Sequence, residues 1–108
     1  MPTSYFFIVN SRIGETKIQR VREAVQVLLP DEASIHLTEY GGHATVLAKQ
    51  AIQEKSSYVV AVGGDGTVNE VVQVMANSGI AMGIVPTGSG NGLARHCLLP
   101  LKIHEAVS

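Results

Sequence analysis

The sequence predicts an α/β fold of three layers, in which helices cover both faces of a mostly parallel sheet. Four short apolar runs, at residues 5–9, 34–37, 58–62 and 82–85, alternate with segments that have the spacing of amphipathic helices. The runs are continuously apolar rather than alternating, as is typical of parallel strands that are buried on both faces. A glycine-containing turn follows each run. Together these features predict a Rossmann-like domain with right-handed crossovers.

The first part of the chain predicts a strand, a helix and a second strand. The apolar run at Tyr5–Val9 predicts a buried strand. Apolar residues at steps of three and four between Ile18 and Leu29 predict an amphipathic helix, because charged residues occupy its other faces. Pro30 ends this helix, since its ring and its missing N–H cannot continue the helical hydrogen bonding. The run at Ser34–Leu37 predicts the second strand.

The following residues repeat this alternation of helix and strand. An apolar stripe between residues 44 and 52 predicts the second helix, and the run at Tyr58–Val62 predicts the third strand. A further stripe from Val68 to Met75 predicts the third helix, which Asn77-Ser78-Gly79 closes. The run at Met82–Val85 predicts the fourth strand.

The composition indicates one globular domain and excludes several classes of function. The 108 residues are 45% hydrophobic and 16% charged, which is typical of a folded domain. The net charge is -1 and the basic residues are scattered, so a nucleic-acid partner is not expected. The single cysteine, Cys97, excludes an internal disulfide and suits the reducing cytosol. Because no segment approaches the roughly 18 apolar residues of a membrane span, we expect a cytoplasmic protein.

Two glycine-rich turns carry the candidate chemistry. Gly63-Gly64-Asp65-Gly66-Thr67 leads from the third strand into the third helix, and Gly88-Ser89-Gly90-Asn91-Gly92 follows the fourth strand. Glycines let a phosphate approach the main chain, and the free N–H groups and the dipole at a helix start favour an anion. In a parallel sheet both turns lie at the carboxyl edge, where ligands bind. The sequence therefore predicts a phosphate-binding site at this edge.

Neither turn has the sequence of the two best-known phosphate-binding motifs. The P-loop requires a glycine followed by lysine, and no glycine here has that neighbour. The dinucleotide motif fails because its third glycine is replaced by Asn69 when counted from Gly64, and by Leu93 when counted from Gly88. A purely structural turn is an open alternative. Asp65 suits two roles, either orienting a water or metal near a phosphate or capping the helix.

The two turns together resemble the diacylglycerol kinase catalytic domain family. The first turn, with Asn69-Glu70 after it, is shared with NAD kinases and more loosely with phosphofructokinases. The second turn points to the lipid branch, which includes bacterial lipid kinases, ceramide kinases and sphingosine kinases. Two weaker matches extend the resemblance over nearly the whole chain. Residues 9–14 resemble the family's Asn-Pro-x-Ser-Gly, with Ser11 for Pro and Ile13 for Ser, and residues 38–44 resemble its Thr-rich turn ending in His-Ala.

This resemblance implies an ATP- and Mg²⁺-dependent lipid kinase of phospholipid metabolism, with the fold of the N-terminal domain of NAD kinases and diacylglycerol kinases. Asp65 would be the catalytic residue near the phosphates, and Asn10 would contact the adenosine side. No metal ligand is assigned. The implied nucleotide site comprises Asn10, Thr38, Gly63, Gly64, Asp65, Gly66, Thr67, Asn69, Gly88, Ser89, Gly90 and Asn91. His43 is interpreted more simply as a solvent-facing residue at the beginning of the second helix.

The resemblance also implies that residues 1–108 are the nucleotide-binding N-terminal domain of a longer protein. Family members have a second, mostly β domain that brings the lipid pocket, further metal ligands and the catalytic base. We therefore expect this chain alone not to phosphorylate lipid, whereas the full-length protein would transfer the ATP γ-phosphate to a lipid hydroxyl, in peripheral contact with the inner face of the membrane. The acceptor stays open among diacylglycerol, a sphingoid base, phosphatidylglycerol and undecaprenol, and so does the oligomeric state.

Two other functions stay open at this point. One is an NAD kinase or another small-metabolite kinase, because the first glycine turn is shared across that superfamily. The other is a non-catalytic nucleotide-binding module.

Overall fold

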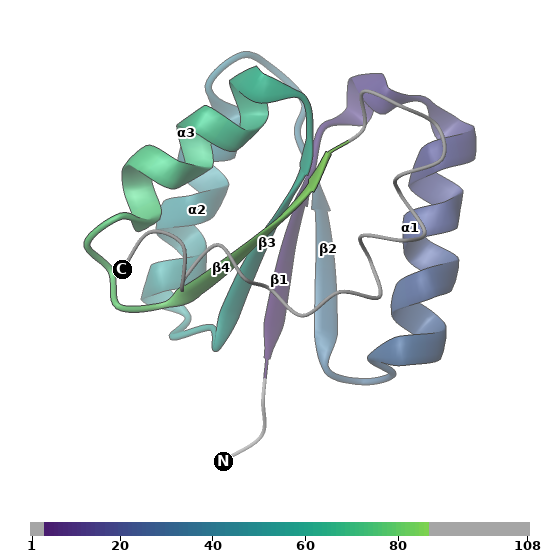
Figure 1. Cartoon of the computed structure of the whole chain (residues 1–108), viewed down its shortest axis with the longest axis horizontal. Coiled ribbons are helices and arrows are strands. Elements are labelled where there is room, and N and C mark those ends of the chain that lie inside the picture. The colour runs from purple at the N-terminus through teal and green to yellow at the C-terminus, as the bar shows by residue number, and fades with distance from the viewer. Residues whose placement is uncertain (1–3, 87–108) are drawn as a thin grey trace.

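The fold is a single parallel sheet between two layers of helices, as the sequence predicts (Figure 1). The structure is a computed structural model and describes residues 4–86 of the chain. Its strands form one sheet in the order β2-β1-β3-β4, and all of the pairs are parallel. The elements are β1 (Tyr5–Val9), the short 3₁₀ turn η1 (Ser11–Ile13), α1 (Glu15–Leu28), β2 (Ala33–Leu37), α2 (His43–Gln53), β3 (Tyr58–Gly63), α3 (Asp65–Met75) and β4 (Ala81–Pro86).

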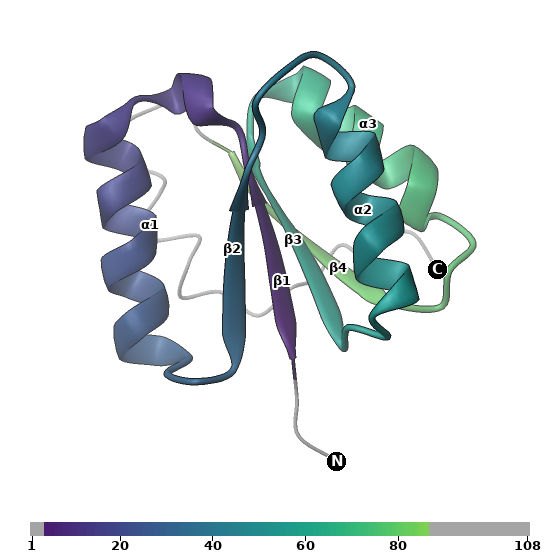
Figure 2. The same ribbon diagram turned by 180° about the vertical axis from the view of Figure 1, so that it is seen from behind.

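The helices divide between the two faces of the sheet. Helix α1 lies on one face, whereas α2 and α3 lie side by side on the other (Figures 1 and 2). Each central strand therefore has to be apolar on both sides. In β1, Phe6 and Ile8 pack in the core beneath α2 and α3, while Phe7 and Val9 pack in the core beneath α1. This explains why the strand sequences are continuously apolar.

The predicted ends of the elements are confirmed for the strands and differ for two helices. Each observed strand matches the predicted apolar run to within one residue at either end. Helix α1 ends at Leu28, two residues before Pro30, because the residue preceding proline is disfavoured in helical conformation. However, α1 begins at Glu15 and α3 at Asp65, each three residues before the predicted apolar stripe. Their first turns are polar, so hydrophobic spacing does not reveal them.

The crossover connections divide between β1 and β3. These two strands are hydrogen-bonded neighbours, yet the chain leaving β1 turns to α1 on one face and the chain leaving β3 turns to α3 on the other (Figure 2). In open α/β sheets, ligands bind in the crevice that such a reversal creates beyond the carboxyl ends of the strands. The topology thus identifies the ends of β1 and β3 as the candidate site. Among the described residues, none of the helices is long and apolar enough to cross a bilayer.

The edge strand β2 contains a half-buried histidine. The ring of His36 stacks on Phe6, with 3.9 Å between the ring centroids and 9° between the planes. Its Nε2 atom lies 2.9 Å from the Ser34 hydroxyl oxygen. Burial lowers the pKa of His36, although the nearby carboxylate of Glu54 acts in the opposite direction. The folded protein therefore favours the neutral imidazole.

We predict that acid destabilises the fold through His36. Because the folded-state pKa lies below the unfolded value of about 6.5, the unfolded chain binds more protons at this residue as the pH falls below that value. The stability is therefore complete above about pH 6.5 and decreases between the unfolded and the folded pKa. Urea unfolding across this pH range should show a shallower pH dependence for His36→Phe, which keeps a ring on Phe6, than for the natural protein. Equal slopes for the two proteins would contradict this role.

Candidate functional site

The candidate site begins with the turn between β3 and α3. Gly63 is buried at the end of β3, whereas Gly64 and Gly66 are exposed. A Cβ atom on Gly63 would lie 3.0 Å from the Asn10 Cβ atom and 3.2 Å from the Cβ and Oγ1 atoms of Thr67. A Cβ atom on Gly64 or Gly66 would meet nothing within 4 Å, and neither residue has a positive φ. The fold therefore requires glycine at 63 but leaves open space at 64 and 66.

The first turn of α3 presents free backbone donors toward this space. No side chain caps α3, whose N-cap residue is Gly64. Within the described part of the chain, the backbone N–H groups of Asp65, Gly66 and Thr67 have no hydrogen-bond acceptor. Such groups, together with the positive end of the helix dipole, form a favourable environment for an anion. The geometry fits a phosphate group, because Gly64 and Gly66 leave room for it next to the main chain.

The other two helices that start at this edge also lack side-chain caps. The N-cap residues of α1 and α2 are Gly14 and Gly42, which have φ angles of 98° and 88°. Helices more often begin with Ser, Thr, Asp or Asn, whose side chains would satisfy the first amides. The described α-helices α1, α2 and α3 thus all direct uncapped N-termini toward the carboxyl edge of the sheet, which is the upper edge in Figure 1.

Side-chain hydrogen bonds connect the ends of the three neighbouring strands. Asn10, directly after β1, donates from Nδ2 to the Thr67 hydroxyl over 3.0 Å, and its Oδ1 accepts from the Arg12 backbone N–H over 2.9 Å. The backbone N–H of Ser11 donates to the hydroxyl of Thr38, after β2, over 3.3 Å. The backbone N–H of Asn10 donates to the Val62 carbonyl over 2.9 Å. The candidate site is therefore built on one connected edge.

The structure brings together most of the residues that the sequence predicts for the nucleotide site. Asn10, Thr38 and the turn at 63–67 share the carboxyl edge of adjacent strands. Thr38 and Thr67 are buried, with 8% and 7% of their surface exposed, whereas Asp65 and Asn69 are exposed. Gly88, Ser89, Gly90 and Asn91, which form the second predicted turn, lie outside the described residues.

The position of His43 differs in part from the sequence-based interpretation. It does begin α2, as predicted, but it is half-buried and its ring stacks on Tyr40 with 4.4 Å between centroids. Its Nδ1 atom accepts a hydrogen bond from the Glu39 backbone N–H over 2.9 Å. The residue thus orders the β2–α2 loop. The hydrophobic pattern carries no signal for this stacked pair, because both residues lie in a polar, glycine-containing loop.

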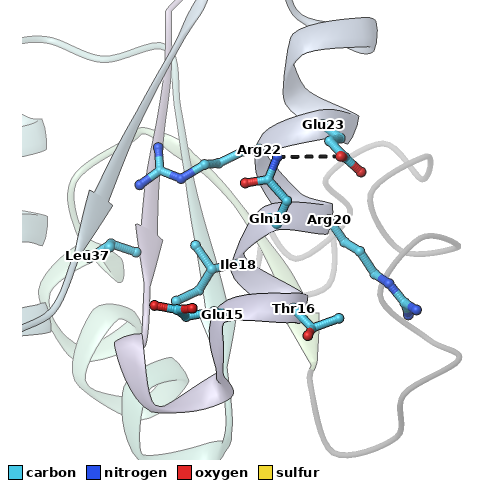
Figure 3. Close-up of a pocket in the computed structure, with 8 residues that line it drawn as sticks. All are labelled: Glu15, Thr16, Ile18, Gln19, Arg20, Arg22, Glu23 and Leu37. Carbon is cyan, nitrogen blue, oxygen red and sulfur yellow. Dashed lines mark hydrogen bonds between the residues drawn. The ribbon is translucent and has the colours of Figure 1, made fainter.

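A hollow on the surface of the protein lies away from the β3–α3 glycine turn. A hollow of about 690 Å³ lies between α1 and the end of β2, with Ile18 and Leu37 among mostly charged and polar side chains (Figure 3). Gln19 donates to Glu23 over 3.4 Å along its wall. No residue of the β3–α3 turn lines this hollow. Within residues 4–86, no group of three or more His, Cys, Asp or Glu side chains has an arrangement that could hold a metal ion.

We predict that Gly63→Ala destabilises the protein. The added Cβ would press on the Cβ atoms of Asn10 and Thr67, neither of which can move without shifting the backbone of β1 or α3. Overpacking of this kind typically costs about 1–3 kcal/mol.

Gly66→Ala is the matched control, because its Cβ would point into open space and alanine favours the helix by up to about 1 kcal/mol. Urea unfolding should therefore give a higher free energy of unfolding for Gly66→Ala than for Gly63→Ala. The opposite order would show that the end of β3 tolerates a side chain.

Comparison with known proteins identifies relatives over almost the whole chain. The sequence profile of the diacylglycerol kinase catalytic domain matches residues 4–108. A YegS-like probable lipid kinase of Pectobacterium atrosepticum is 40% identical over 95 residues, which cover 82% of this chain and 31% of that protein. A diacylglycerol kinase of Staphylococcus carnosus is 34% identical over 105 residues, which cover 93% of this chain and 34% of that protein.

Solved structures show the same similarity. A crystal structure of a candidate diacylglycerol kinase from Bacillus anthracis superimposes with a TM-score of 0.69 and 27% identity, covering 96% of this chain and 40% of that one. The present chain thus spans about a third of the length of the curated relatives described above.

Proposed function

The chain belongs to the diacylglycerol kinase catalytic domain family, and on that premise we propose that it is the nucleotide-binding part of an ATP-dependent lipid kinase. The observation that carries the proposal is the uncapped first turn of α3 at the carboxyl edge of the sheet, where Gly64 and Gly66 leave open space. A nucleoside triphosphate supplies the anionic groups that such a turn binds. The family membership supports ATP as that ligand.

The phosphates would be held mainly by main-chain groups. In this proposal the N–H groups of Asp65, Gly66 and Thr67 donate to phosphate oxygens, and Gly64 lets the chain approach them closely. Thr38 and Asn10 border the same edge. The second glycine turn, at residues 88–91, completes the nucleotide site in the proposal. Phosphoryl transfer depends mostly on such positioning and on charge stabilisation, so donors that are already oriented lower the barrier directly.

Asp65 is the acidic residue in the first turn of α3 and is exposed. A bound Mg²⁺ would neutralise negative charge on the phosphates, and Asp65 is the carboxylate in this turn that can orient water molecules of such an ion. A carboxylate at a helix N-terminus also interacts favourably with the helix dipole, but that effect alone is worth only about 0.3–1 kcal/mol of stability. A role with Mg²⁺ predicts that loss of the Asp65 charge slows phosphoryl transfer, whereas a role with the helix dipole alone predicts only a small loss of stability.

The proposed reaction moves the γ-phosphoryl group from ATP to a lipid hydroxyl. The hydroxyl oxygen forms a bond to the γ-phosphorus, the bond to the β-phosphate oxygen breaks, ADP leaves, and a base accepts the hydroxyl proton. In the proposal, the lipid pocket, further metal ligands and that base belong to sequence beyond these 108 residues, in line with the greater length of the relatives. The kinase would work in the cytoplasm, in peripheral contact with the inner face of the membrane.

We predict that Gly64→Val weakens ATP binding in a protein that stays folded, with only the modest loss of stability expected when valine replaces a glycine N-cap. The valine side chain would fill the space next to the free amides, whereas no described atom lies within 4 Å of its Cβ position. Calorimetric titration of the full-length Gly64→Val protein with Mg·ATP should show at least about a tenfold loss of affinity, equivalent to about 1.4 kcal/mol. Ala76→Val, at the exposed far end of α3, is the control and should bind normally. Unchanged affinity in Gly64→Val would remove the support for this site.

We further predict that Asp65→Asn impairs phosphoryl transfer far more than ATP binding. With ATP labelled at the γ-phosphate, the full-length protein should transfer the label to a lipid extract and not to NAD. Loss of the charge at residue 65 should lower kcat by about a hundredfold or more, which is the scale of removing one electrostatic contributor.

Gln73→Ala, also exposed and two turns further along α3, lies outside the implied nucleotide site and provides a comparison with no change in charge. Normal turnover in Asp65→Asn would limit this residue to a structural role. Labelling of NAD instead of lipid would replace the lipid kinase with a small-metabolite kinase, and labelling of neither would favour a non-catalytic nucleotide-binding module.

A further inference from the structure

We propose that Asn10 is a positioning residue, which holds the first turn of α3 in place through Thr67 and so contributes to nucleotide affinity through the geometry of that turn. This inference rests on the proposed function for its effect on affinity. It is additional to the direct contact on the adenosine side, which the family resemblance implies for this residue. The interaction that carries it is the hydrogen bond between the Asn10 carboxamide and the Thr67 hydroxyl.

Both ends of the Asn10 side chain are already engaged within the protein. Nδ2 donates to Thr67 Oγ1 over 3.0 Å, and Oδ1 accepts from the Arg12 N–H over 2.9 Å. The Asn10 backbone N–H is also bound, to the Val62 carbonyl. One residue thus connects η1, the end of β3 and the start of α3, although Asn10 and Thr67 are 57 positions apart in sequence.

The surroundings make this connection rigid. Thr67 is only 7% exposed, so water competes little for its hydroxyl. A side chain at Gly63 would collide with both Asn10 and Thr67, which shows how closely the two elements approach. Because Thr67 belongs to the first turn of α3, its position also determines where the free N–H groups of Asp65 and Gly66 point.

Loss of the carboxamide should therefore act at a distance on the phosphate donors. Without Asn10, the buried Thr67 hydroxyl loses its partner, and the first turn of α3 is no longer tied to β1. The free amides would then sample several orientations, and binding would have to restrict them again. The expected result is about a tenfold loss of ATP affinity in Asn10→Ala, which is within the range of interaction energies measured between residues of one hydrogen-bond network.

A double-mutant cycle measures how much of the effect of Asn10 passes through Thr67. ATP affinity is measured by calorimetry on the full-length protein for Asn10→Ala, Thr67→Val and the double variant. If Asn10 acts through Thr67, the loss of affinity in the double variant is smaller than the product of the two single losses. If the two side chains act independently, the two losses multiply, and that outcome overturns the proposal.

Hydrogen exchange tests the connection independently of ATP. The backbone amides of residues 68–71, which donate to the carbonyl groups of the first turn of α3, should exchange faster in both single variants, whereas those of 50–55 should not change. Gln50→Ala is the matched control, because it also removes a carboxamide hydrogen bond, the 2.8 Å contact with Glu54 at the end of α2. Unchanged exchange at 68–71 in Asn10→Ala overturns the proposal. If the unsubstituted protein binds no ATP, the proposed function is overturned, and with it the effect of Asn10 on affinity. Hydrogen exchange would still decide whether Asn10 holds the first turn of α3 through Thr67.

Discussion

The close approach of β1 and β3 at their carboxyl ends is the constraint on which the rest of the site depends. Gly63 has to lack a side chain because Asn10 and Thr67 occupy the space beside it. The same approach places the Asn10 carboxamide within 3.0 Å of the Thr67 hydroxyl. Since the chain leaves β1 and β3 toward opposite faces, this contact lies at the reversal point beyond which open α/β sheets generally bind their ligands.

The glycines of the β3–α3 turn differ in what requires them. Packing between strands requires Gly63, whereas nothing among the described residues excludes a side chain at Gly64 or Gly66. An open position next to unsatisfied amides is what a phosphate needs. The hydroxyl groups show a related division, because Thr38 and Thr67 are buried and bonded within the edge, whereas Asp65 projects into solvent. In the proposed site, support of the edge and contact with phosphate thus fall to different residues.

Much of this architecture could be predicted from the sequence, for identifiable reasons. Burial on both faces makes each strand continuously apolar, so Tyr5–Val9 and its counterparts could be located to within a residue. The glycine turn could be placed at the carboxyl edge because it follows such a strand. The first residues of α1 and α3 could not be predicted from hydrophobic spacing, because the first turns of these helices are polar and lie at the carboxyl edge of the sheet. The Asn10–Thr67 bond is a tertiary contact with no local pattern, and the strand order that creates it is likewise absent from the spacing of residues.

The glycine N-caps of α1, α2 and α3 have a consequence for the stability of the protein. Glycine in this position costs a helix only a few tenths of a kcal/mol relative to serine or aspartate, so donors remain open with little loss of stability. An anion that later fills them binds the native state alone and shifts the unfolding equilibrium by mass action. With a nucleotide as that anion, the free energy of unfolding would rise with the nucleotide concentration, and proteolysis of the unfolded state would slow accordingly.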